Sequence, residues 1–280
     1  MTWSIGISTG ACTDLPITAV VEALRDSGAR GLELGTPPRH FSPWEPTQVT
    51  ALATSLTRAA LHAVSIHAPF GGLLDLADPN PQHRHAAVGA ILVAAHALKA
   101  LGGHVVVVHP SDRLRDPADI DARLHDCVQS LVPLTAACER EGLVLALESP
   151  LPHLVGGRPD EFAWILQHAP PRLRVCLDTG HVALAGWWRR FMDVSAGRLV
   201  HVHANDNHGR FDDHLPPGEG TIDWATIASS LTDADFDGWV MLELRRPDGD
   251  IGPYFRRAHA HALALLGRGV QPGTDVASPA

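Results

Sequence analysis

The chain has 280 residues, 45% of them hydrophobic, which is enough to bury a large core in one domain. It carries 22 Lys and Arg residues against 31 Asp and Glu residues, a formal charge of −9, and Lys99 is its single lysine. Proteins that grip nucleic acid through its phosphates need a dense cationic face, so this balance argues against nucleic acid as the main partner.

The same composition bears on the compartment. The four cysteines show neither CxxC spacing nor the density of a disulfide framework, so we interpret them as reduced thiols. The N-terminus lacks the basic segment and long apolar run of a signal peptide, and no apolar run approaches the length of a membrane span. We therefore expect a cytoplasmic protein with no membrane partner.

Eight short apolar or β-branched runs alternate with longer segments whose apolar residues recur at i, i+3 and i+4. The predicted strands are 4–9, 31–36, 63–69, 104–110, 143–149, 173–181, 199–206 and 238–245. The pattern predicts an α/β protein, a single-domain (β/α)8 TIM barrel over residues 1–267, and a Gly/Pro/Ser-rich flexible tail over 268–280. A doubly wound open sheet is the alternative, but no strand is followed by a GxGxxG or GxxxxGK turn.

Most of the predicted strands end in a residue that can bind metal or move a proton. These residues are His67, His109, Glu148, Asp178, His181, His203, Asp206 and Glu243. In a TIM barrel the carboxyl ends of the strands converge on one face, where the loops build the active site. Imidazole nitrogens and carboxylate oxygens together suit Zn or Mn, with Co or Fe as further options. Taken singly, Glu148 could be a paired core carboxylate and Asp178 a helix cap, but the set as a whole predicts a metal-dependent enzyme.

The segment NHGRFDDHLPPGEG after the seventh strand is predicted to be a long loop, and loops of that length are usually functional. Asp212 and His214 are two residues apart, so in an extended segment both side chains point the same way, as a ligand pair does. Gly218 and Gly220 are expected to turn the pair back over the barrel mouth. Asp213, which is out of phase with the pair, is expected to be solvated.

Four residues are candidate substrate contacts. They are His181, Arg210, Glu33 and Trp44. A core ion pair is the alternative for Glu33. Trp44 lies in a proline-rich loop and could close over a small ligand or pack against a second subunit, so a homo-oligomer is left open.

Seven stretches at the strand ends carry a family resemblance. They are SIHAPF, VVVHP, LALESP, CLDTGH, HVHANDN, DDHLPPGEGTIDW and LELR. The chain resembles the xylose-isomerase-like superfamily of TIM barrels, which joins sugar isomerases and epimerases with endonuclease IV. The loop after the seventh strand is most similar to the branch of sugar phosphate isomerases and epimerases.

The resemblance implies three groups of metal ligands. The group shared with single-metal epimerases consists of Glu148, Asp178, His203 and Glu243. The groups shared with endonuclease IV consist of His67, His109 and Glu148, and of His181, Asp212 and His214. The resemblance thus implies one to three divalent ions per chain.

The favoured hypothesis is an isomerase or epimerase acting on a sugar-like hydroxy-ketone. Glu148 and Glu243 come from non-adjacent strands, so one can remove a proton and the other return it, while the metal stabilises the enediolate. The catalytic lysine of xylose isomerases has no counterpart, because Lys99 lies in a predicted helix.

The alternative is a multinuclear zinc phosphoester hydrolase of the endonuclease IV type, in which Glu148 bridges metals. Trp187 and Trp188 could then stack on bases, or could equally cap a sugar pocket. A metal-binding module without chemistry is a third hypothesis, which the intact set of ligand positions disfavours.

Overall fold

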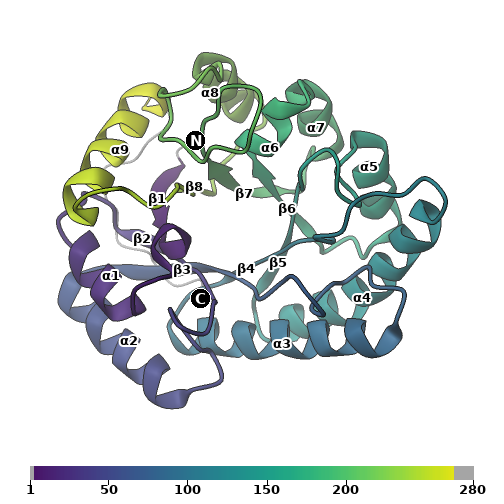
Figure 1. The fold of residues 1–280 in the computed structure, drawn as a ribbon, viewed down its shortest axis with the longest axis horizontal. Coiled ribbons are helices and arrows are strands. Elements are labelled where there is room, and N and C mark those ends of the chain that lie inside the picture. Colours follow the sequence, from purple (N-terminus) through teal and green to yellow (C-terminus); the bar gives the residue numbers. More distant parts are fainter. Residues whose placement is uncertain (1–2, 268–280) are drawn as a thin grey trace.

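The strands follow one another around a closed ring. In the computed structural model, which describes residues 3–267, eight parallel strands pair in sequence order and β8 closes the ring against β1 (Figure 1). The strands are β1 (Ser4–Ser8), β2 (Gly31–Leu34), β3 (His62–His67), β4 (Val105–Val108), β5 (Val144–Glu148), β6 (Arg174–Asp178), β7 (Leu199–Ala204) and β8 (Trp239–Leu242). The predicted (β/α)8 barrel is therefore confirmed, whereas the predicted tail at 268–280 lies outside the described residues.

Helices surround the ring on its outer side (Figure 1). They are α1 (Ile17–Leu24), α2 (Pro46–Ala59), α3 (Pro81–Ala100), α4 (Ile120–Arg140), α5 (Pro159–His168), α6 (Thr179–Leu184), α7 (Trp188–Val194), α8 (Trp224–Asp233) and α9 (Ile251–Leu266), with a short 3-10 turn η1 (Thr9–Cys12) after β1. Proline opens α2, α3 and α5, where its fixed φ suits the first helical turn and its missing N–H costs nothing. Every helix within residues 3–267 is too short or too polar to cross a bilayer.

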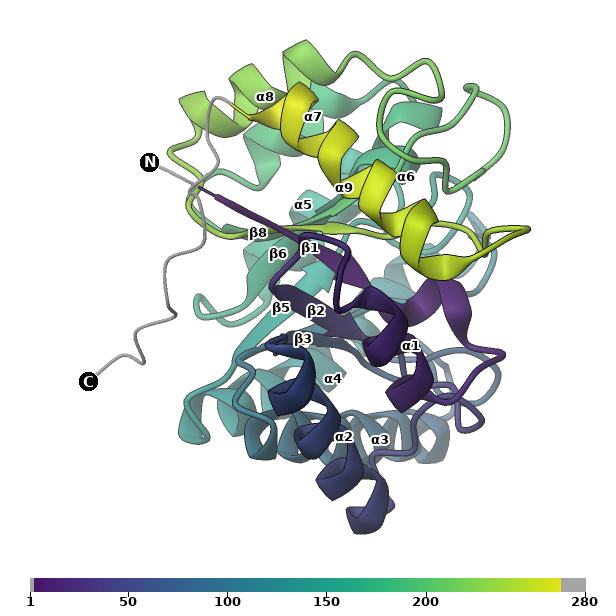
Figure 2. The same cartoon turned by 90° about the vertical axis from the view of Figure 1, so that its left-hand side faces the viewer.

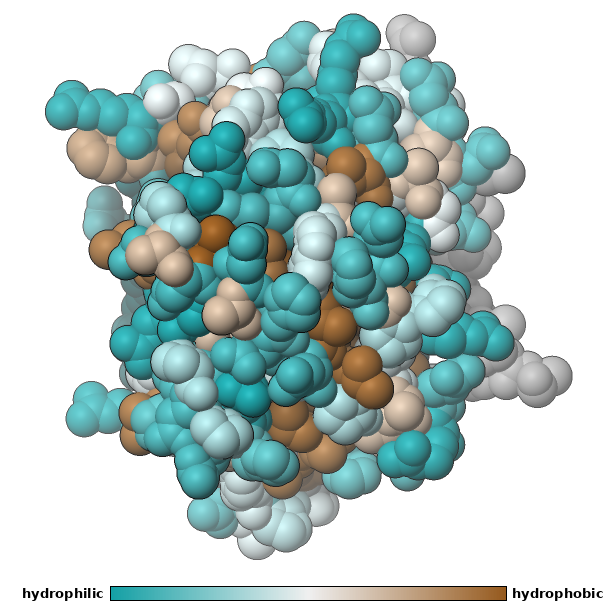
Figure 3. Space-filling view, turned by 90° about the vertical axis from the view of Figure 1, so that its right-hand side faces the viewer, coloured by the Kyte–Doolittle hydropathy of each residue, from teal (hydrophilic) through white to brown (hydrophobic). Residues whose placement is uncertain are grey.

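The run VVVV of β4 shows how the strands bury both faces. Val106 and Val108 pack in the large core between the sheet and the helices, while Val105 and Val107 pack inside the barrel with Ala146. The side chains on both faces of the strand are therefore apolar, as expected for parallel strands that are covered on two sides. The outer face over one side of the helical ring is mainly hydrophilic, with small hydrophobic groups scattered on it (Figure 3).

The loops that follow the strands gather at one end of the barrel, seen from the side in Figure 2. The predicted strand 173–181 was too long, because β6 ends at Asp178 and the next residues form α6.

The four cysteines are buried free thiols, as the sequence predicted.

Candidate metal centre

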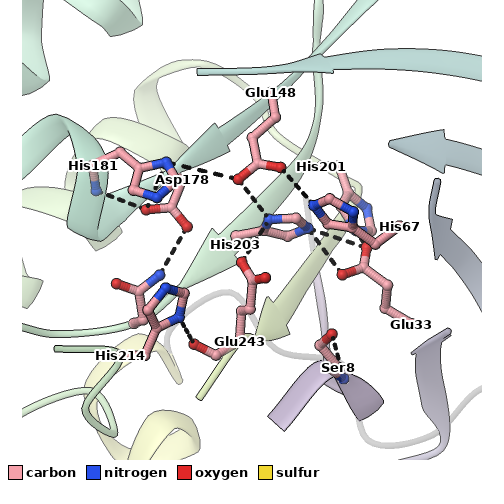
Figure 4. Close-up of polar contacts among 12 residues, drawn as sticks. Ser8, Glu33, His67, Glu148, Asp178, His181, His201, His203, His214 and Glu243 are labelled. Atoms are coloured by element: carbon pink, nitrogen blue, oxygen red, sulfur yellow. Dashed lines mark hydrogen bonds and ion pairs between the residues drawn. The ribbon is translucent and has the colours of Figure 1, made fainter. Parts of the chain in front are cut away.

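Four side chains at the ends of β5 to β8 form what we call the central cluster, Glu148, Asp178, His203 and Glu243. Glu148 and Asp178 end β5 and β6, His203 lies on β7, and Glu243 follows β8. His203 Nδ1 lies 3.1 Å from Glu148 Oε1 and 2.9 Å from Glu243 Oε2 (Figure 4). One potential ligand atom of each residue lies within 4.8 Å of the others. The fold thus brings together the four residues that the resemblance grouped around a single ion.

Asp178 also caps a helix. Its Oδ1 accepts a hydrogen bond from the backbone N–H of His181 at 2.7 Å, and its Oδ2 accepts one from Asn205 Nδ2 at 2.8 Å. This cap ends β6 and puts His181 in the first turn of α6, not on the strand. A Cβ on Gly180 would lie 1.9 Å from Asn205 Oδ1, so glycine is needed for this close approach. The sequence had not singled out Asn205, although it lies two residues after His203.

The β3–β4 cluster consists of His67, His109 and Glu148. The Nε2 atoms of His67 and His109 lie 3.2 and 3.1 Å from Glu148 Oε2, and 3.1 Å from each other. The Phe70 ring stacks parallel on His109, with centroids 4.3 Å apart and planes 2° apart. Phe70 is a contact that the sequence reasoning missed, although the stretch SIHAPF places it directly after the third strand.

The loop cluster consists of His181, Asp212 and His214. Asp212 Oδ2 lies 3.3 Å from His181 Nε2 and 3.0 Å from His214 Nε2. The sequence predicted the pairing of Asp212 with His214 but gave the wrong backbone geometry. His214 has a φ of 48°, in the left-handed region, so the segment curls here and is not extended.

Asp206 anchors the loop that carries this cluster. Its Oδ2 accepts hydrogen bonds from Gly218 N at 2.8 Å and from Trp224 Nε1 at 2.8 Å, and its Oδ1 accepts one from Ile222 N at 3.1 Å. Its backbone pairs with that of Leu215, the residue after His214. The sequence analysis identified Asp206 as a strand-end residue. In the structure its carboxylate accepts hydrogen bonds from the loop and belongs to none of the three clusters.

Three of the candidate ligand histidines have their second ring nitrogen fixed by a backbone carbonyl. The Nδ1–O distances are 3.3 Å from His67 to Ala68, 2.9 Å from His181 to Ser149 and 2.9 Å from His214 to Glu243. A carbonyl oxygen only accepts, so each Nδ1 donates its proton, and each Nε2 faces its cluster and presents a lone pair there once its own proton is displaced. The rings therefore have the orientation that a metal-binding histidine would need.

Burial and charge act against each other in these clusters. Burial favours the neutral forms, yet the neighbouring His203 and His109 hold the pKa of Glu148 well below its usual range. Burial likewise acts to lower the pKa of His181, but the carboxylates of Asp178 and Asp212 raise it to about 10. For Asp178 burial prevails and raises the pKa to about 6. In the metal-free protein, protons on the histidines therefore balance the carboxylates.

The donor set fits divalent ions. Several buried atoms in these clusters have no hydrogen-bond partner among residues 3–267. They include Glu148 Oε2, which the β3–β4 cluster and the central cluster share, His203 Nδ1 of the central cluster and Asp212 Oδ1 of the loop cluster. Such orphaned polar atoms are costly unless something binds them. Mixed imidazole and carboxylate donors are those that Zn and Mn accept. The residues present could therefore hold one ion per cluster.

Residues of all three clusters line a cavity of about 850 Å³ at the barrel mouth, although Asp178 and His203 of the central cluster do not border it. Glu148 and Glu243 both border it, and so does Trp44, which is 46% exposed. A cavity of this size suits a small molecule.

Two of the other candidate substrate contacts lie elsewhere. Glu33 is fully buried inside the barrel beside His201 and His203, in the core ion pair that the sequence left open as an alternative. Arg210 lies outside the cavity lining, with its guanidinium 5.0 Å from the centroid of the exposed Phe211 ring.

The two tryptophans considered as base-stacking residues are held on the outside of the barrel. Trp188 Nε1 donates to Ser230 Oγ at 3.0 Å, and Trp187 packs against the core with Arg158 over its ring. Neither lines the cavity.

A closed eight-stranded barrel with His, Asp and Glu side chains at its strand ends defines a TIM-barrel protein with its candidate site at the carboxyl end of the sheet. The profile of the xylose isomerase-like TIM barrel family matches residues 21–265. The chain belongs to this family, as the sequence resemblance predicted.

Individual relatives agree with this assignment. An uncharacterized protein of Methanocaldococcus jannaschii is 28% identical over 189 residues, 64% of each chain, so this chain spans less than two thirds of that relative's length. A Streptomyces coelicolor protein named as a hydroxypyruvate isomerase is 25% identical over 277 residues, 90% of this chain and 94% of that one. The crystal structure of a D-tagatose 3-epimerase-like protein shares the fold with a TM-score of 0.82, at 23% identity over 95% of this chain and 98% of that one.

Proposed function

We propose that this protein is a divalent-metal-dependent isomerase or epimerase that acts on a sugar or a sugar-like hydroxy-ketone. The observation that carries the proposal is the pair Glu148 and Glu243, which border one cavity and both lie within 3.1 Å of His203 Nδ1. Two carboxylates that flank one ligand position can exchange protons with a carbon held between them. The names of the Streptomyces relative and of the epimerase-like structure support the same class of reaction.

The central cluster would hold the ion. Zn or Mn bound there supplies a Lewis acid that stabilises negative charge on the substrate oxygens. In the metal-free protein, the charge of His203 outweighs burial and lowers the pKa of both Glu148 and Glu243, and the charge of a bound divalent ion would act in the same direction in place of the His203 proton. Either carboxylate can therefore serve as the proton acceptor.

One of these glutamates, in its ionised form, takes the proton from the carbon beside the substrate carbonyl. The other must be protonated when the substrate binds; it donates its proton to the opposite face of that carbon, which gives the epimer and leaves the two glutamates with exchanged protonation states. For ketose–aldose exchange, the proton is instead returned to the former carbonyl carbon, while the hydroxyl proton of the first carbon moves to the former carbonyl oxygen. His181 borders the cavity, and its Nε2 can hydrogen-bond a substrate hydroxyl when no ion occupies the loop cluster. Trp44 on the cavity wall can cover the sugar and exclude water.

Solvent exchange tests this proposal. The manganese-loaded protein, incubated in D2O with a panel of ketoses and hydroxypyruvate, should incorporate deuterium at the carbon next to the carbonyl, followed by NMR. Glu243→Gln should abolish the exchange, because the amide cannot accept the proton. Glu161→Gln, a buried glutamate on α5 that pairs with Arg115 at 2.6 Å, is the matched control and should retain it. Exchange that persists in Glu243→Gln would refute the role of this residue.

A phosphoester hydrolase remains a second candidate because of one observation. The β3–β4 cluster and the loop cluster each bring three potential ligand atoms within 4.8 Å, beside the central cluster. Three metals that share bridging carboxylates generate hydroxide and neutralise a phosphate. Cleavage of an abasic-site duplex by the zinc-loaded protein, without deuterium exchange on any ketone, would favour this function.

A further inference from the structure

Glu33 lies beneath the central cluster, inside the barrel. Its side chain and those of His201 and His203 are fully buried. Glu33 belongs to β2 and His203 to β7, 170 positions later in the chain. Figure 4 shows Glu33 on the side of His203 away from Glu148 and Glu243. Glu33 therefore meets the candidate metal centre only through the His203 ring.

Three donors converge on this one carboxylate. Ser65 Oγ donates to Glu33 Oε2 at 2.9 Å, and the Nε2 atoms of His201 and His203 both lie 3.1 Å from the same oxygen. All three contacts bring a donor to the same carboxylate oxygen, so Glu33 acts as the acceptor in this group.

The consequence falls on His203. An ionised carboxylate only accepts hydrogen bonds, so Glu33 fixes the His203 proton on Nε2. When a metal displaces the other proton of His203, the lone pair is on Nδ1, between Glu148 at 3.1 Å and Glu243 at 2.9 Å. A charged acceptor behind a metal-binding histidine makes the imidazole a stronger ligand than a neutral acceptor does.

His203 differs in this respect from the histidines of the other two clusters. The Nδ1 atoms of His67, His181 and His214 each donate to a neutral backbone carbonyl, and Nδ1 of His109 has no hydrogen-bond partner in the described part of the chain. The carboxylate partner is thus found behind the histidine of the central cluster.

We propose that Glu33 is a positioning residue that makes the central cluster the tightest of the three metal sites, so that this cluster fills first when metal is scarce. The proposal rests on the metal dependence of the proposed function, but not on its isomerase chemistry. It assigns Glu33 to the metal through His203 and not to the substrate.

The test measures zinc affinity, not turnover. A background with His109→Ala and Asp212→Ala removes one ligand from each outer cluster and leaves the central four. Zinc is titrated into this protein in competition with a chromogenic chelator, with and without Glu33→Gln. The glutamine keeps the size and one acceptor oxygen but removes the charge. We expect the zinc dissociation constant to rise by about 10- to 100-fold.

Glu161→Gln is the matched control, because Glu161 is also a buried carboxylate, bonded to Arg115 Nε at 2.6 Å and to Gly156 N at 3.1 Å. It should leave the dissociation constant within about threefold of the background, because it touches no ligand. Ser65→Ala removes one of the hydrogen bonds to Glu33 and leaves His203 bonded. It should weaken zinc binding in the same direction by less than about tenfold, and it provides the test if Glu33→Gln does not fold.

Two results would overturn the proposal. One is zinc affinity in both Glu33→Gln and Ser65→Ala that stays within about threefold of the background, and the other is an equal loss in Glu161→Gln. A background protein that binds no zinc would overturn this proposal together with the metal dependence of the proposed function. A wild-type protein that binds zinc but exchanges no deuterium would refute the isomerase proposal alone.

Discussion

The Nε2 atoms of His67 and His109 face each other at 3.1 Å, and Glu148 Oε2 lies within 3.2 Å of both. Two imidazole nitrogens at this distance can share one proton or bind one cation, but two lone pairs cannot face each other unopposed. Glu148 also contacts His203 through its other oxygen, Oε1. One carboxylate therefore joins the β3–β4 cluster to the central cluster.

This geometry predicts a loss of bound metal in His109→Ala. The variant should bind one equivalent of zinc fewer than the wild type, because the remaining His67 and Glu148 do not complete a site, while the central cluster keeps its four ligands. Elemental analysis of protein purified without chelator measures this. His125→Ala is the control, because His125 is exposed on α4 and its Nδ1 donates to Asp121 O. An unchanged zinc content in His109→Ala, with wild-type zinc near one equivalent, would show that the cluster serves the substrate instead.

The raised pKa values of the histidines predict how metal binding depends on pH. Burial acts to lower the pKa of His67 and His214, but Glu148 raises the first to about 9 and Asp212, with Glu243, raises the second to about 10. Both are therefore protonated at pH 7 in the metal-free protein, and a metal must displace these protons. Zinc affinity should rise as the pH increases from 6 to about 9. Calorimetric titration in buffers of different ionisation enthalpy measures the protons released; release of none at pH 7 would contradict this assignment.

The same shifts predict the stability of the metal-free protein. A histidine whose pKa is raised on folding stabilises the native state fully below its ordinary pKa of 6.5 and loses this contribution as the pH rises through its folded value. For His67, His181 and His214 the loss falls between pH 6.5 and about 10. The Tm of chelator-treated protein should therefore fall over this range. The zinc-loaded protein is the comparison, and its Tm should exceed that of the metal-free protein by more at pH 9 than at pH 7. A metal-free Tm that rises with pH would be incompatible with these charges.

Asp206→Asn should loosen the loop cluster. Its carboxylate accepts hydrogen bonds from Gly218 N, Ile222 N and Trp224 Nε1, and the amide of asparagine would turn a donor toward at least one of these groups. We expect a loss of about 2–3 kcal/mol in the free energy of unfolding, from urea denaturation, and weaker binding of one zinc ion. Asp213→Asn is the control on the same loop, since Asp213 makes one exposed hydrogen bond to His208 N. Equal effects of the two substitutions would mean that Asp206 has no special role.

Trp44→Ala should affect substrate binding more than catalysis. Trp44 lines the cavity and is 46% exposed, so its ring is free to cover a sugar. Loss of one aromatic contact should raise KM on the order of tenfold, with kcat nearly unchanged. Steady-state kinetics on the substrate found by deuterium exchange measures both. Trp188→Phe, on the outer surface beside Ser230, should change neither constant. A change in the oligomeric state of Trp44→Ala, with KM unchanged, would assign the residue to a subunit contact.

The sequence by itself determined the barrel and the ligand types. Continuous apolar runs such as Val105–Val108 indicate strands buried on both faces, and a polar residue at the end of such a run has no structural use there. Because parallel strands in a barrel end on one face, Glu148, Asp178 and His203 were predicted to meet without any knowledge of distances.

Only the tertiary structure decided how the remaining groups are used. Periodicity reports which face of an element is buried, but not a loop dihedral such as the left-handed φ of His214, nor the helix cap that moves His181 off the strand. Periodicity also does not reveal which charged side chains from opposite strands of the barrel will contact each other. Glu33 and His203 are 170 residues apart in the chain, and their hydrogen bond exists because β2 and β7 direct both side chains into the same closed interior.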